Sequence, residues 1–130
     1  MFRAAKMKQI LNAQITGTSL GYEESIFTFR LILDLQDGGA ACVGCYALDT
    51  YSEEKKDRIG SAYGMDVISA ILKVVGVRKW EELKGKYIRV QSEGIGTSIT
   101  VIGNLMKNIW LDFETFEKDK NGLVFGNRVG

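Results

Sequence analysis

The sequence predicts an α+β fold in which an antiparallel β-sheet packs with one main α-helix and a short second helix. Three patterns support this prediction. Residues 26–35 alternate between an apolar face and a mixed face, as in a half-buried strand, and residues 36–39 (QDGG) favour a tight hairpin. Apolar residues within 65–75 recur at spacings of three and four, as on one face of a helix. Two further β-like runs, residues 86–92 and 98–105, flank a second Gly-rich turn.

The main helix has clear expected ends and an expected apolar stripe. Ser61 is a typical N-cap residue, and Gly76 tolerates the left-handed backbone that ends many helices. The predicted stripe consists of Met65, Ile68, Ile71, Leu72 and Val75.

The other segments follow the same rules of pattern and turn chemistry. We expect strands at residues 8–18 and 40–48, a turn region at 17–25, and a charged surface loop or frayed helical turn at 49–58. We expect a short helix or turn at 77–83, a strand or helix at 110–116, and a charged, then Gly-rich tail from about residue 117 that is mobile. Residues 1–130 are expected to form a single ligand-binding domain.

Composition excludes several classes of function. The net charge is only +1, from 17 basic and 16 acidic residues, whereas a protein that coats DNA or RNA normally carries a basic excess. The chain has no His, which removes the usual general base and the usual neutral metal ligand. No apolar run is long enough to span a bilayer or to form a signal peptide, so we expect a cytoplasmic protein. We expect no enzyme activity, metal or cofactor.

Cys42 and Cys45 form a C-x-x-C pair. A structural zinc site needs about four ligands, and the chain has no other Cys and no His. A thioredoxin-like pair opens a helix after a parallel strand, whereas this pair follows a Gly-Gly hairpin. Odd spacing in an extended strand sends the two side chains to opposite faces. We therefore interpret both as structural thiols.

The segment Arg58-Ile59-Gly60-Ser61 is the better candidate for a binding site. It enters the main helix, whose free N–H groups suit a phosphate, and Arg58 can contact a phosphate through two donors. Gly60 allows close approach of backbone or ligand, and Ser61 can cap the helix. An ordinary capped helix with an exposed Arg explains the same residues. Aromatic residues near polar groups, including Tyr22 and Tyr63, are candidates for base stacking, although most such residues in a small domain are core.

Four motifs together resemble a family of small phage and prophage proteins, the first-described Thoeris anti-defence family. These motifs are YALD at 46–49, KKDRIGSAYGMDVI at 55–68, ILKVVGV with WEELKGKYIRV at 71–90, and IGNLMKNIW at 102–110. The resemblance covers about residues 19–113. It implies a sponge that binds cyclic ADP-ribose-type signals, made by bacterial TIR-domain enzymes, without cleaving them. It also implies a homo-oligomer (dimer or higher) whose ligand pockets use residues from paired subunits.

The resemblance also suggests which residues bind the ligand. Arg58 is the expected phosphate contact, Asn104 in the IGN motif is expected to read a base or ribose edge, and Arg30 to supply a second cation. Arg128 is a further candidate in a tail beyond the matching region. Two other functions stay open: a phage inhibitor that binds a host defence protein directly, as anti-CRISPR proteins do, and a hydrolase of the signal that uses Asp or Glu.

Overall fold

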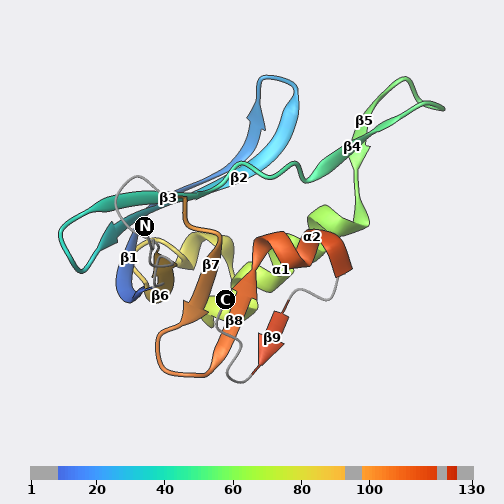
Figure 1. Ribbon diagram of the computed structural model, residues 1–130. Helices are drawn as coiled ribbons and strands as arrows, with labels where there is room; N and C mark the ends of the chain where they lie inside the picture. The colour runs from blue at the N-terminus through green and yellow to red at the C-terminus, as the bar shows by residue number, and fades with distance from the viewer. Residues whose placement is uncertain (1–8, 93–97, 120–122, 126–130) are drawn as a thin grey trace, which may run out of the picture.

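The computed structural model of the protein describes residues 9–92, 98–119 and 123–125 (Figure 1). These residues form an α+β fold, as the sequence predicts. The strands are β1 (Gln9–Glu23), β2 (Ile26–Leu35), β3 (Ala40–Gly44), β4 (Asp49–Ser52), β5 (Asp57–Gly60), β6 (Tyr87–Ser92), β7 (Val101–Asn104), β8 (Ile109–Asp112) and β9 (Leu123–Phe125). The helices are α1 (Ala62–Val75), α2 (Phe113–Asp119) and a short 3₁₀ helix, Trp80–Glu82.

Seven strands form one antiparallel sheet in the order β3-β2-β1-β6-β7-β8-β9. The long strand β1 joins its two halves. Its C-terminal part pairs with β2, its N-terminal part pairs with β6, and a register shift between Ile15 and Gly17 marks a bulge beside the change of partner. A bulge bends a strand and increases its twist, which lets one strand serve both halves of the sheet.

Strands β4 and β5 form a separate two-stranded antiparallel ribbon. In Figure 1 this ribbon projects away from the rest of the molecule, next to the start of α1. Its exposed apolar side chains include Tyr51 and Ile59, which are 52% and 36% exposed. The sequence prediction of a loop or helical turn at 49–58 is therefore wrong. Four-residue strands with mixed polarity show too little alternation to be recognised from sequence.

The core lies between one face of the sheet and α1. The residues that α1 buries are Gly64, Val67, Ala70, Ile71 and Val74, and they meet sheet residues such as Phe29, Leu31, Ile88, Ile102 and Leu111 in one cluster. The predicted stripe is confirmed except at its start, since Ile68, Leu72 and Val75 also pack partly buried against this cluster. Ile71 is buried, but Met65 is 67% exposed, because the helix approaches the sheet along the side that carries the small residue Gly64.

Three other sequence predictions changed. The turn expected at 17–25 is mostly strand, because β1 continues to Glu23 and only Glu24 and Ser25 make the turn. The run at 110–116 contains both alternatives, the end of β8 and the start of α2. Strand β9 was not predicted. Within the described part of the chain, no helix has the length and apolar character needed to cross a membrane.

Candidate functional site

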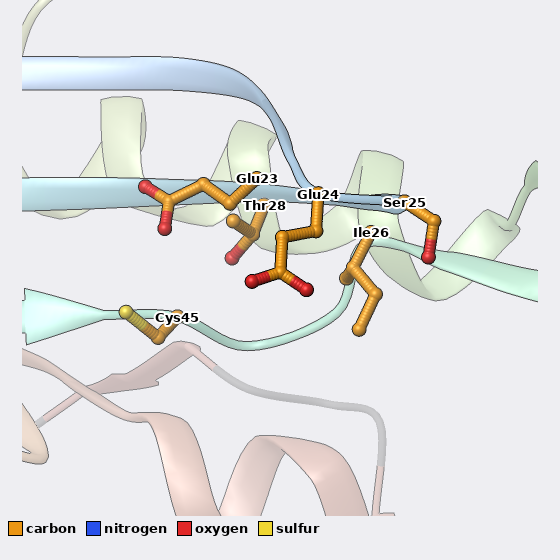
Figure 2. Close-up of a pocket in the computed structure, with 6 residues that line it drawn as sticks. All are labelled: Glu23, Glu24, Ser25, Ile26, Thr28 and Cys45. Carbon is orange, nitrogen blue, oxygen red and sulfur yellow. The ribbon is translucent and has the colours of Figure 1, made fainter.

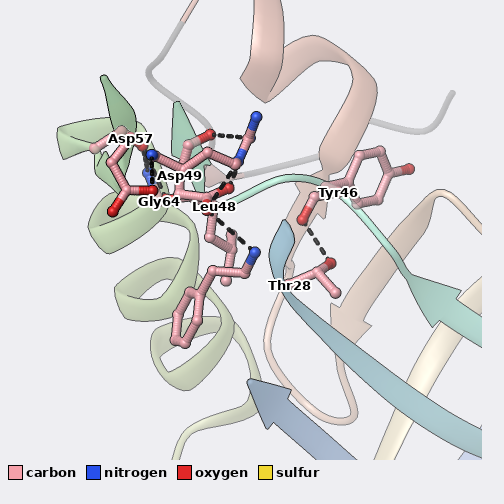
Figure 3. A network of polar contacts seen from close by, with 9 residues as sticks. Thr28, Tyr46, Leu48, Asp49, Asp57 and Gly64 are labelled. Atoms are coloured by element: carbon pink, nitrogen blue, oxygen red, sulfur yellow. Dashed lines mark hydrogen bonds and ion pairs between the residues drawn. The ribbon is translucent and has the colours of Figure 1, made fainter. Parts of the chain in front are cut away.

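Arg58 on β5 is held by Asp49 on the paired strand β4 (Figure 3). The Arg58 Nε donates to Asp49 Oδ2 at 3.1 Å, and Nη2 donates to Asp49 Oδ1 at 2.8 Å and to the Asp49 carbonyl oxygen at 3.1 Å. The side chain of Arg58 is 29% exposed and that of Asp49 only 4%. This two-pronged ion pair fixes the plane of the guanidinium, and among the described residues Arg58 Nη1 has no hydrogen-bond partner.

Asp49 connects this ion pair to the main sheet. Its Oδ2 also accepts a hydrogen bond from the backbone N–H of Phe27 on β2, at 3.2 Å. The Arg58 guanidinium, with a smaller contribution from the Phe27 N–H, holds the pKa of Asp49 below its ordinary value although burial opposes this shift. The Asp49 carboxylate also raises the pKa of Arg58. Asp49 is therefore ionised at neutral pH, and it anchors the base of the β4–β5 ribbon to β2.

Ser61 forms the N-cap of α1, as predicted. Its Oγ accepts a hydrogen bond from Gly64 N at 2.9 Å and donates one to the Leu48 carbonyl oxygen at 3.0 Å (Figure 3). The first turn of α1 contains no acidic side chain of its own, and a carboxylate within that turn is what would offset the positive end of the helix dipole most directly. Ser61 thus serves the fold directly, and the first turn of α1 contributes no carboxylate to the surroundings of Arg58.

Gly60 and Tyr63 have different surroundings from those expected. A Cβ at Gly60 would meet nothing within 4 Å, so no close approach of protein backbone requires glycine there. Tyr63 packs on Phe116 of α2, with ring centroids 5.6 Å apart, which places its ring against the domain. At the start of the helix, it is Gly64 that allows a close approach, against Leu48. Its signal in the sequence was a glycine inside a helical pattern, where glycine is costly without a packing reason.

Arg30 forms a second paired cation on the face of the sheet away from the core. Its Nη2 donates to Glu23 Oε1 at 2.8 Å and lies 3.5 Å from Cys45 Sγ. The structure therefore places a carboxylate beside each of the two arginines predicted to bind phosphate. Tyr22 is 71% exposed and meets Phe27 edge to face, with ring centroids 5.2 Å apart.

A shallow cavity of about 300 Å³ lies near Arg30 (Figure 2). Glu23, Glu24, Ser25, Ile26 and Thr28 of the β1–β2 hairpin line it together with Cys45. Two carboxylates in this lining make the cavity unfavourable for a phosphate unless a cation accompanies it. The cavity is therefore a weaker candidate for an anion than the surroundings of Arg58.

Cys42 and Cys45 are both free and exposed. The expectation that they face opposite sides of the strand is wrong. Arg30 and Cys42 lie on the same face, because Arg30 pairs with Gly44 two residues from Cys42, and Cys45 reaches this same Arg30. Positive φ angles of 136° at Gly44 and 68° at Cys45 end the strand alternation. Partial desolvation raises the pKa of the Cys42 thiol, which disfavours a reactive thiolate there.

Asn104 at the end of β7 is committed to the fold. Its Nδ2 donates to the carbonyl oxygens of Val74 and Val75 at 2.9 and 3.4 Å, and its Oδ1 accepts from the backbone N–H groups of Met106 and Lys107. All four hydrogen-bonding positions of the amide are occupied by backbone groups. Asn104 therefore caps the C-terminal end of α1 and has no position left for a base edge in this arrangement.

The predicted site residues separate into three places. Arg58, Gly60, Ser61 and Tyr63 surround the start of α1, and Arg30 and Tyr22 lie on the β1–β2 hairpin. Asn104 lies at the other end of α1, a 14-residue helix that is about 20 Å long at 1.5 Å per residue. One small ligand does not span that distance within a single subunit. Arg128 lies outside the described residues.

Sequence reasoning missed the carboxylate partners Asp49 and Glu23. Asp49 is the last residue of the YALD motif and Glu23 follows Tyr22, but only the folded chain places them beside an arginine. Within residues 9–92, 98–119 and 123–125, no group of three or more Cys, Asp or Glu side chains is arranged to hold a metal ion. Comparison of the chain with protein-family models, with curated proteins and with solved structures finds no match.

Proposed function

We propose that this protein binds a cyclic nucleotide signal of the cyclic ADP-ribose type and sequesters it without cleaving it. The observation that carries the proposal is the oriented guanidinium of Arg58 beside the start of α1. Asp49 holds the guanidinium by two of its nitrogens, Nη1 has no partner among the described residues, and the first turn of α1 carries no acidic side chain. An oriented Arg next to a helix N-terminus favours a phosphate group.

The resemblance of the RIGSAYG segment and its flanking motifs to Thoeris anti-defence proteins supports the choice of ligand. It also supports a setting in the cytoplasm of a phage-infected bacterium. The absence of His from the chain favours holding the signal over cleaving it.

Charge balance limits what one subunit contributes to binding. Asp49 neutralises most of the charge of Arg58, and Glu23 does the same for Arg30, so a single guanidinium attracts a phosphate only modestly. A tight complex with a diphosphate needs a further cation. We propose that it comes from a second copy of the chain or from Arg30 after Glu23 moves away.

The test is capture and release of the signal. The protein is incubated with individual cyclic ADP-ribose isomers, separated from free ligand and heat-denatured, and the released compound is analysed by mass spectrometry. Release of the intact isomer supports sequestration, and release of an altered compound supports a hydrolase. If no isomer is captured by the folded protein, the proposal fails.

Arginine variants test the role of Arg58 in that assay. We expect Arg58→Ala to weaken capture by about tenfold or more, because a charge-assisted contact is lost. Arg78→Ala is the matched control, since Arg78 lies in the segment after α1 rather than before it. If Arg58→Ala folds and captures the signal as well as Arg78→Ala does, Arg58 is not the phosphate contact.

The projecting β4–β5 ribbon favours a second candidate function, direct binding to a host defence protein. Its strands expose Tyr51 on one face and Ile59 on the other, because they lie on neighbouring cross-strand pairs. Aromatic side chains on a projecting element commonly anchor protein interfaces. Ile59→Ala, on the face of the ribbon away from Arg58, would then reduce the inhibitory activity without affecting nucleotide capture. The two candidates are separated in infected cells: loss of inhibition in Arg58→Ala supports sequestration, and loss of inhibition only in the ribbon variant supports direct binding to a protein.

A further inference from the structure

The free edge of strand β3 carries an inference that does not depend on any ligand. β3 is the terminal strand of the seven-stranded sheet, and no described strand pairs with its outer edge. Natural edge strands are often protected from further pairing by Pro or by a charged residue, most often Lys. Here residues 38–48 (GGAACVGCYAL) contain no charged residue and no Pro. This edge therefore lacks protection by charge or proline, and the five-residue length of β3 is what limits pairing there.

The hydrogen-bond pattern shows which backbone groups face outward. Leu35 N donates to the Gly39 carbonyl oxygen at 2.7 Å, which makes these two residues a hydrogen-bonded pair. Because hydrogen-bonded and non-hydrogen-bonded pairs alternate in an antiparallel ladder, Cys42 with Ile32 is a non-hydrogen-bonded pair. The N–H and C=O of Cys42 thus point to the free edge, as do those of Ala40. Ala40 and Cys42 are both exposed.

We propose that a second copy of this chain pairs antiparallel with this edge, with a two-fold axis at Cys42. An isologous contact of this kind sets Cys42 opposite the partner's Cys42 and Gly44 opposite the partner's Ala40. This register brings outward-facing backbone groups of both copies together. It joins the two sheets into one continuous sheet.

The side chains agree with that register in three rows across the seam. On the outer face, Ile32 and Cys42 continue into the partner's Cys42 and Ile32, and Ile32 is 44% exposed in the single chain. This row is apolar from end to end.

The other two rows avoid like charges. Leu31 and Val43 continue into the partner's Ala41 and Leu33 and extend the apolar inner face. In the third row, Arg30 and Gly44 continue into the partner's Ala40 and the partner's Asp34. The two charged residues of this row are therefore opposite in sign and stand at its two ends. No two equal charges therefore meet across the seam, which matches the self-complementarity that a two-fold contact needs.

The expected dimer is weak. Two five-residue strands cover less surface than the roughly 1,600 Å² of a standard interface, so we expect dissociation in the micromolar range. Sedimentation equilibrium of the full chain without nucleotide, over a concentration series, measures it. We expect Cys42→Lys to raise the dissociation constant by about tenfold or more, because it sets two like charges opposite each other at the axis. Tyr51→Lys, on the exposed ribbon, is the matched control and keeps the wild-type value.

The two cysteines test the register independently of that variant. The chain contains only Cys42 and Cys45, so Cys45→Ser leaves Cys42 alone and Cys42→Ser leaves Cys45 alone. In the proposed register the Cα atoms of the two Cys42 residues are about 5.5 Å apart. A short bifunctional thiol reagent should therefore cross-link the Cys45→Ser variant into covalent dimers and form no covalent dimers of the Cys42→Ser variant.

Three results would overturn the proposal. The first is a monomer at every concentration. The second is a dimer that Cys42→Lys leaves unchanged, and the third is cross-linking through Cys45 instead of Cys42. Nucleotide capture is measured in a separate assay, so failure of this interface and failure of the proposed function are distinguishable.

Discussion

Gly64 in the first turn of α1 lies so close to Leu48 that a Cβ on Gly64 would collide with the Leu48 carbonyl oxygen. The same carbonyl accepts the hydroxyl of Ser61. The helix therefore meets the segment before β4 through its backbone, and this contact sets where the β4–β5 ribbon and Arg58 stand relative to α1.

This contact predicts that Gly64→Ala is destabilising despite the higher helix propensity of alanine. We expect a loss of about 1–3 kcal/mol in the free energy of unfolding, because the neighbour is rigid backbone and the helix must shift. Urea denaturation measures it. Gly60→Ala is the control, since a Cβ there meets nothing within 4 Å. Equal stability of Gly64→Ala and Gly60→Ala would contradict the close contact.

The N-cap of α1 predicts a smaller effect at Ser61. Ser61→Ala removes the acceptor for Gly64 N and should cost about 1 kcal/mol in the free energy of unfolding. Ser61→Asp keeps a hydrogen-bond acceptor and should lose less stability than Ser61→Ala. Ser69→Ala, at an exposed position within the helix, should be neutral or slightly stabilising. Thermal unfolding followed by circular dichroism compares the three variants, and a neutral Ser61→Ala would argue against the cap.

The hydrogen bonds of the Asn104 amide predict that its removal lowers stability without reducing ligand capture. Asn104→Ala leaves the Val74 carbonyl and the Met106 N–H without their partner, and we expect a loss of about 1–3 kcal/mol in stability. Nucleotide capture by the folded fraction should stay unchanged, since Arg58 lies at the other end of α1. Specific loss of capture in a variant with wild-type stability would instead place Asn104 in a ligand site.

The ion pair of Asp49 with Arg58 predicts that the stability of the fold depends on pH in the acidic range. Because folding lowers the pKa of Asp49, the unfolded state binds the proton more tightly, so this pair stabilises the fold above the ordinary Asp pKa of about 3.9. The contribution is lost as pH falls through the lower pKa of the folded state. Asp49→Asn lacks this proton-linked part, so its stability should change less than that of the wild type below about pH 4. The free energy of unfolding of both proteins, measured by denaturation about once per pH unit between about pH 2 and 7, tests the difference. Parallel curves for the two proteins would show that the pair contributes nothing to the pH dependence.

Elements with strong local signals were predicted well from the sequence. Residues 26–35 became β2 with the predicted bounds, and α1 begins after Ser61 and ends before Gly76 as predicted. Strict alternation, a hydroxyl N-cap and a glycine with left-handed backbone are local features, so neighbouring residues suffice to recognise them. The ribbon at 49–60 was missed because each of its strands is only four residues long and is stabilised by its partner and by the Asp49 ion pair.

The candidate site was less predictable than the fold. The sequence alone determined that Arg58, Gly60 and Ser61 lead into a capped helix, because capping depends on residues a few positions apart. Only the tertiary structure decided that Asp49 orients Arg58, that Cys45 turns toward Arg30, and that Asn104 caps the end of α1 opposite to the one that Arg58 precedes. These relationships join residues far apart in the chain. They depend on strand pairing and on the packing of α1, which no local pattern specifies.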